Sequence, residues 1–482
     1  MAEETMLIVG SIVIGILVFM LTYRFFIIIS YNSLNIMALN EFNKFYSEID
    51  FVCSQETKST AKINFTITEN TRVVYASDNQ KPVLKVTENI KNGKISDGNY
   101  ICMQFKNQQE PKCYETKCKV YMPYVGSLEI WNDFKLFVNK ILGKPLVKEY
   151  DFEIKKTIYG VDLSYEGYDS LKVPVLAVSY IPLDTNGEID TSLTGDWKEK
   201  DKEKLENYTV ELTENLCSLI TEGTIYKYFD NYENTPSLNY YFIGLEKRYE
   251  ILPKKNGFVD LKKILEDIDI CEYVDDSNVK EVWVWVYRDN DKPVEFSTVF
   301  GHNSKNFWNF DVDSDGEKDF GLIGSYHLND LPVCKNSYTV YNFLITSSLG
   351  EIIGNYTHRI EKTLSYVDEN TWLRFNSSCG TTDCPPNLDW PYCLYYWNSE
   401  EEKNSNCVSW YRENEYFSAI NCHTWYGSIC EDDFGLKYKI WWMQNIPGKN
   451  NGIKLDDGSK IKNWWEFIGN FDKALMKEGL IE

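Results

Sequence analysis

The chain has 482 residues, enough for two to four domains of about 100–200 residues each. It contains 50 basic and 72 acidic residues, so its formal net charge is −22. That charge argues against nucleic acid as a partner, because nucleic-acid binding needs a basic surface. The sequence also lacks G-x-G-x-x-G, G-x-x-x-x-G-K-S/T and G-x-S-x-G, which argues against nucleotide binding and against a serine-hydrolase elbow.

An apolar segment opens the chain. Residues 6–23 carry no charge, Arg24 follows, and the apolar run continues to Ile29. A helix over residues 6–29 would be about 36 Å long and could cross a hydrocarbon core of about 30 Å. We therefore expect residues 1–30 to form a single-pass transmembrane anchor that contacts the lipid bilayer through residues 6–29.

Two other interpretations of this segment are less favoured. A cleaved signal peptide would have a basic start and an A-x-A-like site, but Ala2-Glu3-Glu4-Thr5 comes first and no such site follows. A pilin-like subunit remains a further alternative, although the basic stretch that precedes the apolar helix in such precursors is missing.

The 13 cysteines indicate where the rest of the chain lies. They form a first group of four, three widely spaced residues and a last group of six within about fifty residues. Such groups predict disulfide-stapled regions outside the cytoplasm. We therefore expect a cell-membrane protein with most of the chain extracytoplasmic. Zinc binding is the weaker alternative to disulfides, because no C-x-x-C pair occurs. An intracellular location is the alternative to an extracytoplasmic one, because intracellular proteins of hyperthermophilic archaea can also hold disulfides.

The anchor leads into two predicted domains. Apolar residues recur every three or four positions over 31–50 and predict a stalk helix. Alternating apolar and polar residues over 51–182 predict a mostly-β domain with one helix near 127–142. Residues 183–206 are polar without an apolar period and predict a linker.

Residues 207–370 predict a mixed α/β domain with helices near 205–222, 259–268 and 349–367. The segment EVWVWVYR is apolar on both faces, so it should be a central strand in a covered sheet. Residues 371–482 hold six cysteines and predict a loop-rich, Cys/Trp-rich module that ends in a helix near 463–478. The fold class of the whole chain is therefore α+β.

The most specific motif is an acidic loop, DVDSDGEKD. Its aspartates occupy positions 1, 3, 5 and 9 of a calcium loop, with glycine at position 6 where the chain must turn: Asp311, Asp313, Asp315, Asp319 and Gly316. The loop resembles those of EF-hand, dockerin and thrombospondin repeats, although Leu322 replaces the bidentate glutamate of the EF-hand. We expect either a structural calcium site or a solvated acidic turn.

A second candidate site involves a histidine and two carboxylates. His358 and Glu361 lie three residues apart on a predicted helix, hence on one face. Together with Asp383, they could hold a metal or act as acid and base in a membrane-tethered, metal-dependent hydrolase. The alternative, which we favour, is a hydrogen bond or ion pair on the helix surface.

Several motifs carry a family resemblance: SYTVYN at Ser337–Asn342, residues Thr357–Glu361, CGTTDCPPN at Cys379–Asn387 and WWMQNIPG at Trp441–Gly448. They resemble a module of uncharacterised secreted archaeal and bacterial proteins, in which C-G-x-x-H-x-P-P-N would be expected. Asp383 stands at the expected histidine, which weakens a histidine-based mechanism. Residues 1–180 are similar to uncharacterised membrane proteins of methanogenic archaea. Neither resemblance implies an activity.

Two functions therefore compete. The first is a cell-surface binding or structural protein with a glycan or protein partner, since exposed C-terminal aromatic rings could stack on sugars. The second is the hydrolase that uses His358, Glu361 and Asp383. We favour the first, and we expect most C-terminal tryptophans to fill a core, because tryptophan is usually buried.

Overall fold

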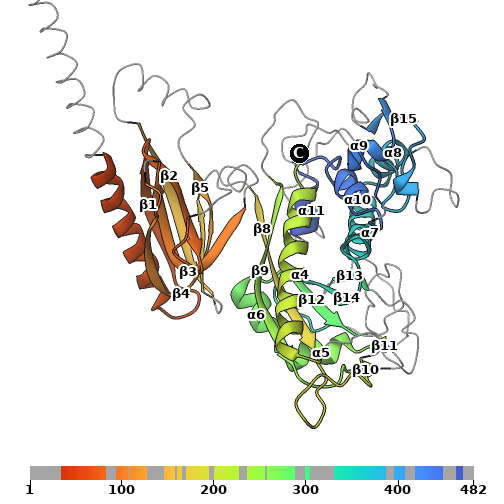
Figure 1. The fold of residues 1–482 in the computed structure, drawn as a ribbon, viewed down its shortest axis with the longest axis horizontal. Coiled ribbons are helices and arrows are strands. Elements are labelled where there is room, and N and C mark those ends of the chain that lie inside the picture. The colour runs from red at the N-terminus through yellow and green to blue at the C-terminus, as the bar shows by residue number, and fades with distance from the viewer. Residues whose placement is uncertain are drawn as a thin grey trace, which may run out of the picture. The chain divides into compact units, whose positions relative to one another are not determined.

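The chain divides into two compact units, Met1–Tyr168 and Asp169–Glu482 (Figure 1). The computed structural model describes residues 34–82, 94–106, 108–126, 146–157, 160–165, 170–194, 200–226, 236–255, 258–287, 299–303, 331–386, 396–407, 418–431, 433–448 and 463–470. Three predictions fall outside these residues: the apolar segment 6–29, the helix near 127–142 and the calcium loop Asp311–Asp319. Within the described part of the chain, no helix combines the length and apolar character that crossing a bilayer requires.

The first unit is a seven-stranded sheet in the order β1-β6-β7-β4-β3-β2-β5. Neighbouring strands are antiparallel except β4 and β7, which are parallel. The strands are β1 (Thr60–Thr68), β2 (Thr71–Ser77), β3 (Ile95–Phe105), β4 (Lys112–Pro123), β5 (Val125–Gly126), β6 (Val147–Lys156) and β7 (Val161–Tyr165). The prediction of a mostly-β region is confirmed here.

A helix over residues 34–53 covers this sheet. Its side chains Phe42, Phe45 and Ile49 are fully buried in the core of the unit. The ring of Phe45 lies 4.4 Å from that of Phe65 and 4.9 Å from that of Phe152. The predicted helix is therefore present, but its apolar stripe packs against the sheet instead of forming a separate stalk over 31–50.

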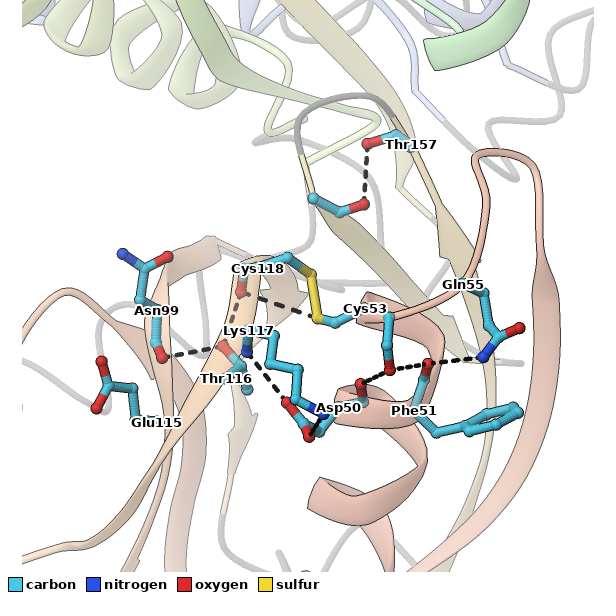
Figure 2. The surroundings of a disulfide bond; sticks show 12 residues. Asp50, Phe51, Cys53, Gln55, Asn99, Glu115, Thr116, Lys117, Cys118 and Thr157 are labelled. Carbon is cyan, nitrogen blue, oxygen red and sulfur yellow. Dashed lines mark hydrogen bonds and ion pairs between the residues drawn. A yellow bond between two sulfur atoms is a disulfide. The ribbon is translucent and has the colours of Figure 1, made fainter.

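A disulfide joins the end of this helix to strand β4. Cys53 is bonded to Cys118, and the carboxylate of Asp50 lies beside the bond (Figure 2). Asp50 accepts a hydrogen bond from the backbone N–H of Lys117 at 3.1 Å and pairs with its Nζ at 2.9 Å. A second disulfide joins Cys102 and Cys113, which face each other on β3 and β4. The first group of cysteines therefore staples one unit, as predicted.

The second unit contains a five-stranded mixed sheet in the order β13-β14-β12-β8-β9. All pairs are parallel except β13 with β14. Its strands are β8 (Leu171–Tyr180), β9 (Leu238–Arg248), β12 (Glu281–Val286), β13 (Val299–Asn303) and β14 (Thr339–Leu344). As predicted, EVWVWV is a central strand, and all six residues of β12 are buried.

Strand β8 corrects a predicted boundary. The sequence placed residues 171–180 in the mostly-β domain that ends at 182, but β8 pairs with β9 and β12 of the second unit. The run LKVPVLAVSY is buried along eight consecutive positions, which suits a parallel strand covered on both faces. Part of the predicted linker is also ordered, since Leu183 and Ile189 form a β-bridge.

The described part of the second unit also contains eight α-helices. They are α4 (Lys202–Gly223), α5 (Leu261–Asp267), α6 (Ile270–Ser277), α7 (Leu349–Val367), α8 (Glu369–Cys379), α9 (Cys422–Tyr426), α10 (Leu436–Met443) and α11 (Trp465–Gly469). The predicted helices near 205–222, 259–268 and 349–367 are confirmed. The helix predicted near 463–478 is represented by α11 alone, because residues 471–482 lie outside the described part.

The Cys/Trp-rich region 371–482 is not a separate module. Helix α10 packs against α4 and α7, and α11 packs against α7, β8 and β9. All these elements belong to one compact unit. The described C-terminal tryptophans therefore contribute to the core that the mixed sheet and its helices share.

Candidate functional site

The structure brings His358, Glu361 and Asp383 together, although 22 positions separate Glu361 from Asp383 in the chain. The Nδ1 atom of His358 lies 3.1 Å from Oε2 of Glu361, one turn further along α7. Its Nε2 atom lies 3.5 Å from Oδ2 of Asp383. The three side chains are partly exposed, with 28%, 18% and 33% of their surfaces accessible.

These contacts favour the protonated form of the imidazole. Burial alone lowers the pKa of His358, but the hydrogen bond to Glu361 and the charges of Glu361 and Asp383 together raise it above its ordinary value. A carboxylate faces each ring nitrogen, and only the doubly protonated imidazolium can donate to both. The group is therefore arranged as a positive charge between two negative ones.

The loop that carries Asp383 is held from several sides. The backbone N–H of Thr382 donates to Oε1 of Glu361 at 2.9 Å. The hydroxyl of Tyr438 donates to the carbonyl oxygens of Thr381 and Cys384, at 2.7 and 3.0 Å. Disulfides involve both Cys379, which is bonded to Cys407, and Cys384. We call residues 380–384 with His358 and Glu361 the carboxylate clasp.

A buried lysine lies close to the clasp. Lys439 of α10 is 3% exposed, and its Nζ donates to the carbonyl oxygens of Gly350 and Phe434 at 2.9 and 2.6 Å. The same atom lies 4.5 Å from the centre of the Trp397 ring. Burial lowers the pKa of Lys439 to about 8, although Asp383 and other carboxylates oppose the shift. These contacts join α10 to the first turn of α7, so the Lys439 side chain has a structural role.

The clasp is poorly arranged for a metal ion. Both ring nitrogens of His358 face carboxylates, so a metal would have to displace one of them. Within the described residues, one group of metal-binding side chains brings three ligand atoms within 4.8 Å of one another, and it is Cys422, His423 and Cys430. Cys422 and Cys430 are joined in a disulfide, so neither sulfur is a free thiolate ligand.

A second polar cluster lies at the centre of the sheet. Oε1 of Glu281 accepts hydrogen bonds from Nη1 of Arg359 and the hydroxyl of Tyr240, each at 3.0 Å. Its Oε2 accepts from Nε1 of Trp283 at 3.0 Å, and Nη2 of Arg359 donates to the Ile468 carbonyl at 3.1 Å. The Glu281 and Arg359 side chains are 2% and 1% exposed. Because both side chains are buried, a ligand in solution does not contact this pair. The pair instead stabilises the packing of α7 and α11 on β12.

The C-terminal tryptophans do not form an exposed sugar platform in the described residues. Six of the seven described are at most 7% exposed, and Trp425 is partly exposed; the six are Trp372, Trp397, Trp441, Trp442, Trp464 and Trp465. The rings of Trp372 and Trp442 lie 6.2 Å apart edge to face, as in an aromatic core. The prediction that these residues fill a core is confirmed for this set, while Trp390 and Trp410 lie outside the described residues.

A partly open pocket of about 560 Å³ lies on the first unit, over strands β1, β6 and β7. Its lining residues come from these three strands: Lys62, Ile63, Asn64, Asp151, Phe152, Glu153, Ser164 and Tyr165. The rings of Phe152 and Tyr165 pack on the core face of the sheet, so the charged, amide and hydroxyl groups face the pocket. Nδ2 of Asn64 donates to Oδ1 of Asp151 at 3.0 Å. Charged, amide and hydroxyl groups that converge on one surface suit a hydroxyl-rich ligand better than an apolar one.

Comparisons with other proteins assign no family. A scan against protein-family models and searches of curated proteins and of solved structures find no match. The resemblances drawn from the sequence therefore stay predictions. Sequence reasoning identified the clasp but missed Lys439 and the Cys422–His423–Cys430 group. The group's cysteines are eight positions apart, so a search for C-x-x-C spacing could not find them.

Proposed function

We propose that the chain is a disulfide-stapled, extracytoplasmic binding or structural protein that residues 6–29 tether to the cell membrane. The observation that carries this proposal is the set of five disulfides among the described cysteines, which occur in both units. Structural disulfides on this scale persist outside the cytoplasm. Of the two remaining described cysteines, Cys384 is also disulfide-bonded, and Cys217 is a free thiol buried in the protein.

Limited proteolysis of membranes tests this location. The full chain is expressed with a C-terminal epitope, and protease is added to intact cells and to inverted membrane vesicles. We expect digestion of the epitope on intact cells and protection in inverted vesicles. The reverse pattern would place the two units in the cytoplasm, and recovery of undigested chain in the aqueous fraction without detergent would contradict the anchor.

The pocket on the first unit supports binding as the role. Asn64, Asp151 and Ser164 offer hydrogen-bonding groups at one surface, a combination that suits sugars. Calorimetric titration with a panel of neutral oligosaccharides should give binding that Asp151→Ala abolishes. Lys44→Ala is the matched control, since this exposed helix residue lies outside the pocket. Absence of binding across the panel would leave a structural role as the better assignment.

The convergence of His358, Glu361 and Asp383 favours a second candidate, the metal-dependent hydrolase. Glu361 orients the imidazole, and displacement of Asp383 would free Nε2 for a metal or for a water molecule. Chromogenic ester and phosphodiester substrates, assayed with and without added Zn²⁺, test this role. Turnover that His358→Ala and Glu361→Gln both abolish would support the enzyme. Equal background rates in all three proteins would exclude it for these substrates.

A further inference from the structure

The disulfide between Cys422 and Cys430 differs from the others in its surroundings. It closes a loop with a sequence separation of 8, and Cys422 begins helix α9. Gly427 caps this helix with a φ of 82°, a backbone conformation that glycine adopts without strain, and the chain then turns back toward Cys422. Cys422 is fully buried and Cys430 is half-buried, so the two sulfurs are unequally accessible.

A histidine lies against the more accessible sulfur. Nδ1 of His423 is 2.7 Å from the carbonyl oxygen of Gly427 and 3.6 Å from Sγ of Cys430. A carbonyl oxygen can only accept, so Nδ1 must carry the hydrogen, and the same N–H faces the sulfur. Sulfurs of other described disulfides contact carbonyl oxygens, for example Cys53 with the Cys118 carbonyl and Cys379 with the Cys407 carbonyl.

This difference matters for the reduced form. A neighbouring N–H stabilises a thiolate, whereas a carbonyl oxygen repels it. An accessible cysteine with such a donor, paired with a buried second cysteine, has the features of a thiol–disulfide exchange pair. We propose that Cys422–Cys430 exchanges with solvent thiols, that Cys430 is the exchanging sulfur, and that Cys422 is the resolving sulfur. His423 is a positioning residue that stabilises the Cys430 thiolate.

The reaction balances as follows for a monothiol such as glutathione. Its thiolate attacks Sγ of Cys430, the Cys422–Cys430 bond breaks, and Cys422 leaves as a thiolate that takes a proton from water. A second glutathione thiolate attacks the glutathione sulfur of the mixed disulfide, and Cys430 leaves as a thiolate beside His423. Two glutathione molecules are oxidised to one disulfide, and the protein disulfide gains the two electrons. Glutathione disulfide reverses both steps.

The first test measures the order in which the disulfides open. The intact protein is incubated with reduced glutathione near neutral pH, quenched with an alkylating agent and mapped by mass spectrometry. We expect Cys422–Cys430 to open first. The matched control is Cys102–Cys113, whose separation of 11 gives a similar loop but beside whose sulfurs no histidine of the described residues lies. Simultaneous opening of the two, or earlier opening of the control, would overturn the proposal.

The second test assigns the roles of the two sulfurs. Cys422→Ser leaves Cys430 free and should accumulate a mixed disulfide with glutathione disulfide. Cys430→Ser leaves the buried Cys422 and should accumulate little. Trapping at Cys422 instead would reverse the assignment and contradict the argument from burial.

The third test addresses His423. His423→Ala should shift the exchange equilibrium toward the protein disulfide by about tenfold, the effect of about one unit in the pKa of Cys430. It should also raise the pH at which Cys430 reacts with iodoacetamide in the Cys422→Ser background. An unchanged equilibrium and an unchanged pH profile, with the melting temperature preserved, would show that the histidine is only structural and would overturn its role.

Discussion

The two units both carry disulfides, but only the second has a buried Glu281–Arg359 ion pair among the described residues of its sheet. In the first unit, a helix covers an antiparallel sheet, and the disulfides Cys53–Cys118 and Cys102–Cys113 join the elements covalently. The second unit holds the other three described disulfides, and its central strand β12 also carries the buried Glu281–Arg359 pair. A disulfide stabilises mainly by restricting the unfolded chain, whereas a buried ion pair fixes how folded elements meet. The comparison therefore predicts that reduction weakens both units, whereas substitution of one charged residue of the buried pair weakens the second.

The physical reason for this difference is how much of each sheet is buried. Helix 34–53 packs on a sheet whose core cluster includes Phe45, Phe65 and Phe152, and a core of this size benefits from crosslinks. Strand β12 is buried along its whole length, so a charge within it must find all its hydrogen bonds inside the protein. Glu281 does so through Arg359, Tyr240 and Trp283.

The largest expected effect comes from breaking the buried pair. Arg359→Met leaves Glu281 buried without its positive partner and should lower the free energy of unfolding by about 3–5 kcal/mol. Thermal or denaturant unfolding measures this loss. The double variant Glu281→Gln/Arg359→Met should recover much of it, because no charge is then left unpaired. A single variant as stable as the parent would show that the pair does not organise the second unit.

The next effect concerns the staple between helix and sheet. Cys53→Ser/Cys118→Ser opens a loop with a separation of 65, so the first unit should lose up to about 4 kcal/mol of stability. Proteolysis should then cut near residues 34–53 first. If the helix stays as protected as before, packing of Phe42 and Phe45 alone suffices to hold it.

A smaller loss of stability is expected when the disulfide between strands β3 and β4 is removed. Cys102→Ser/Cys113→Ser opens a loop with a separation of 11, and the chain-entropy term is then about 3 kcal/mol. Urea unfolding of the two double-serine variants under identical conditions sharpens the comparison within the first unit. Equal losses would indicate that native-state contacts, not loop length, determine the stabilisation.

The smallest effect is the pH dependence of the carboxylate clasp. The pKa of His358 is raised in the folded state, so its contribution is fully present below its unfolded pKa of about 6.5 and is lost as pH rises through the folded value. Because the side chains are partly exposed, we expect no more than about 1 kcal/mol. Melting temperatures between about pH 6 and 9 should fall in the parent relative to His358→Gln. Parallel curves would contradict the raised pKa.

Local patterns in the sequence predicted several elements well. The two-sided apolar run EVWVWV gave the buried central strand β12, and the apolar period gave α7 and the helix now described over 34–53. Such patterns are set by residues near one another in the chain, so they need no knowledge of the fold. Such patterns do not identify the surface against which an element packs. The apolar stripe of residues 34–53 predicted a helix correctly, but it could not show that this stripe packs against the sheet.

Contacts between distant residues could not be predicted in the same way. Arg359 reaches Glu281 across 78 positions, and Asp383 reaches His358 only because Tyr438 and the disulfides fold its loop toward α7. The sequence suggested the clasp residues as a set but not their order around the imidazole. That order, with a carboxylate at each ring nitrogen, is what disfavours a metal at this site.

The most direct test of the central claim counts thiols. Protein purified from its membrane without reductant is denatured and alkylated, and the modified cysteines are mapped. An extracytoplasmic, disulfide-stapled chain should yield one free thiol per molecule, Cys217, and it should react only after denaturation because it is buried. Several free thiols among the cysteines of the five described disulfides would contradict the staples and the extracytoplasmic location together.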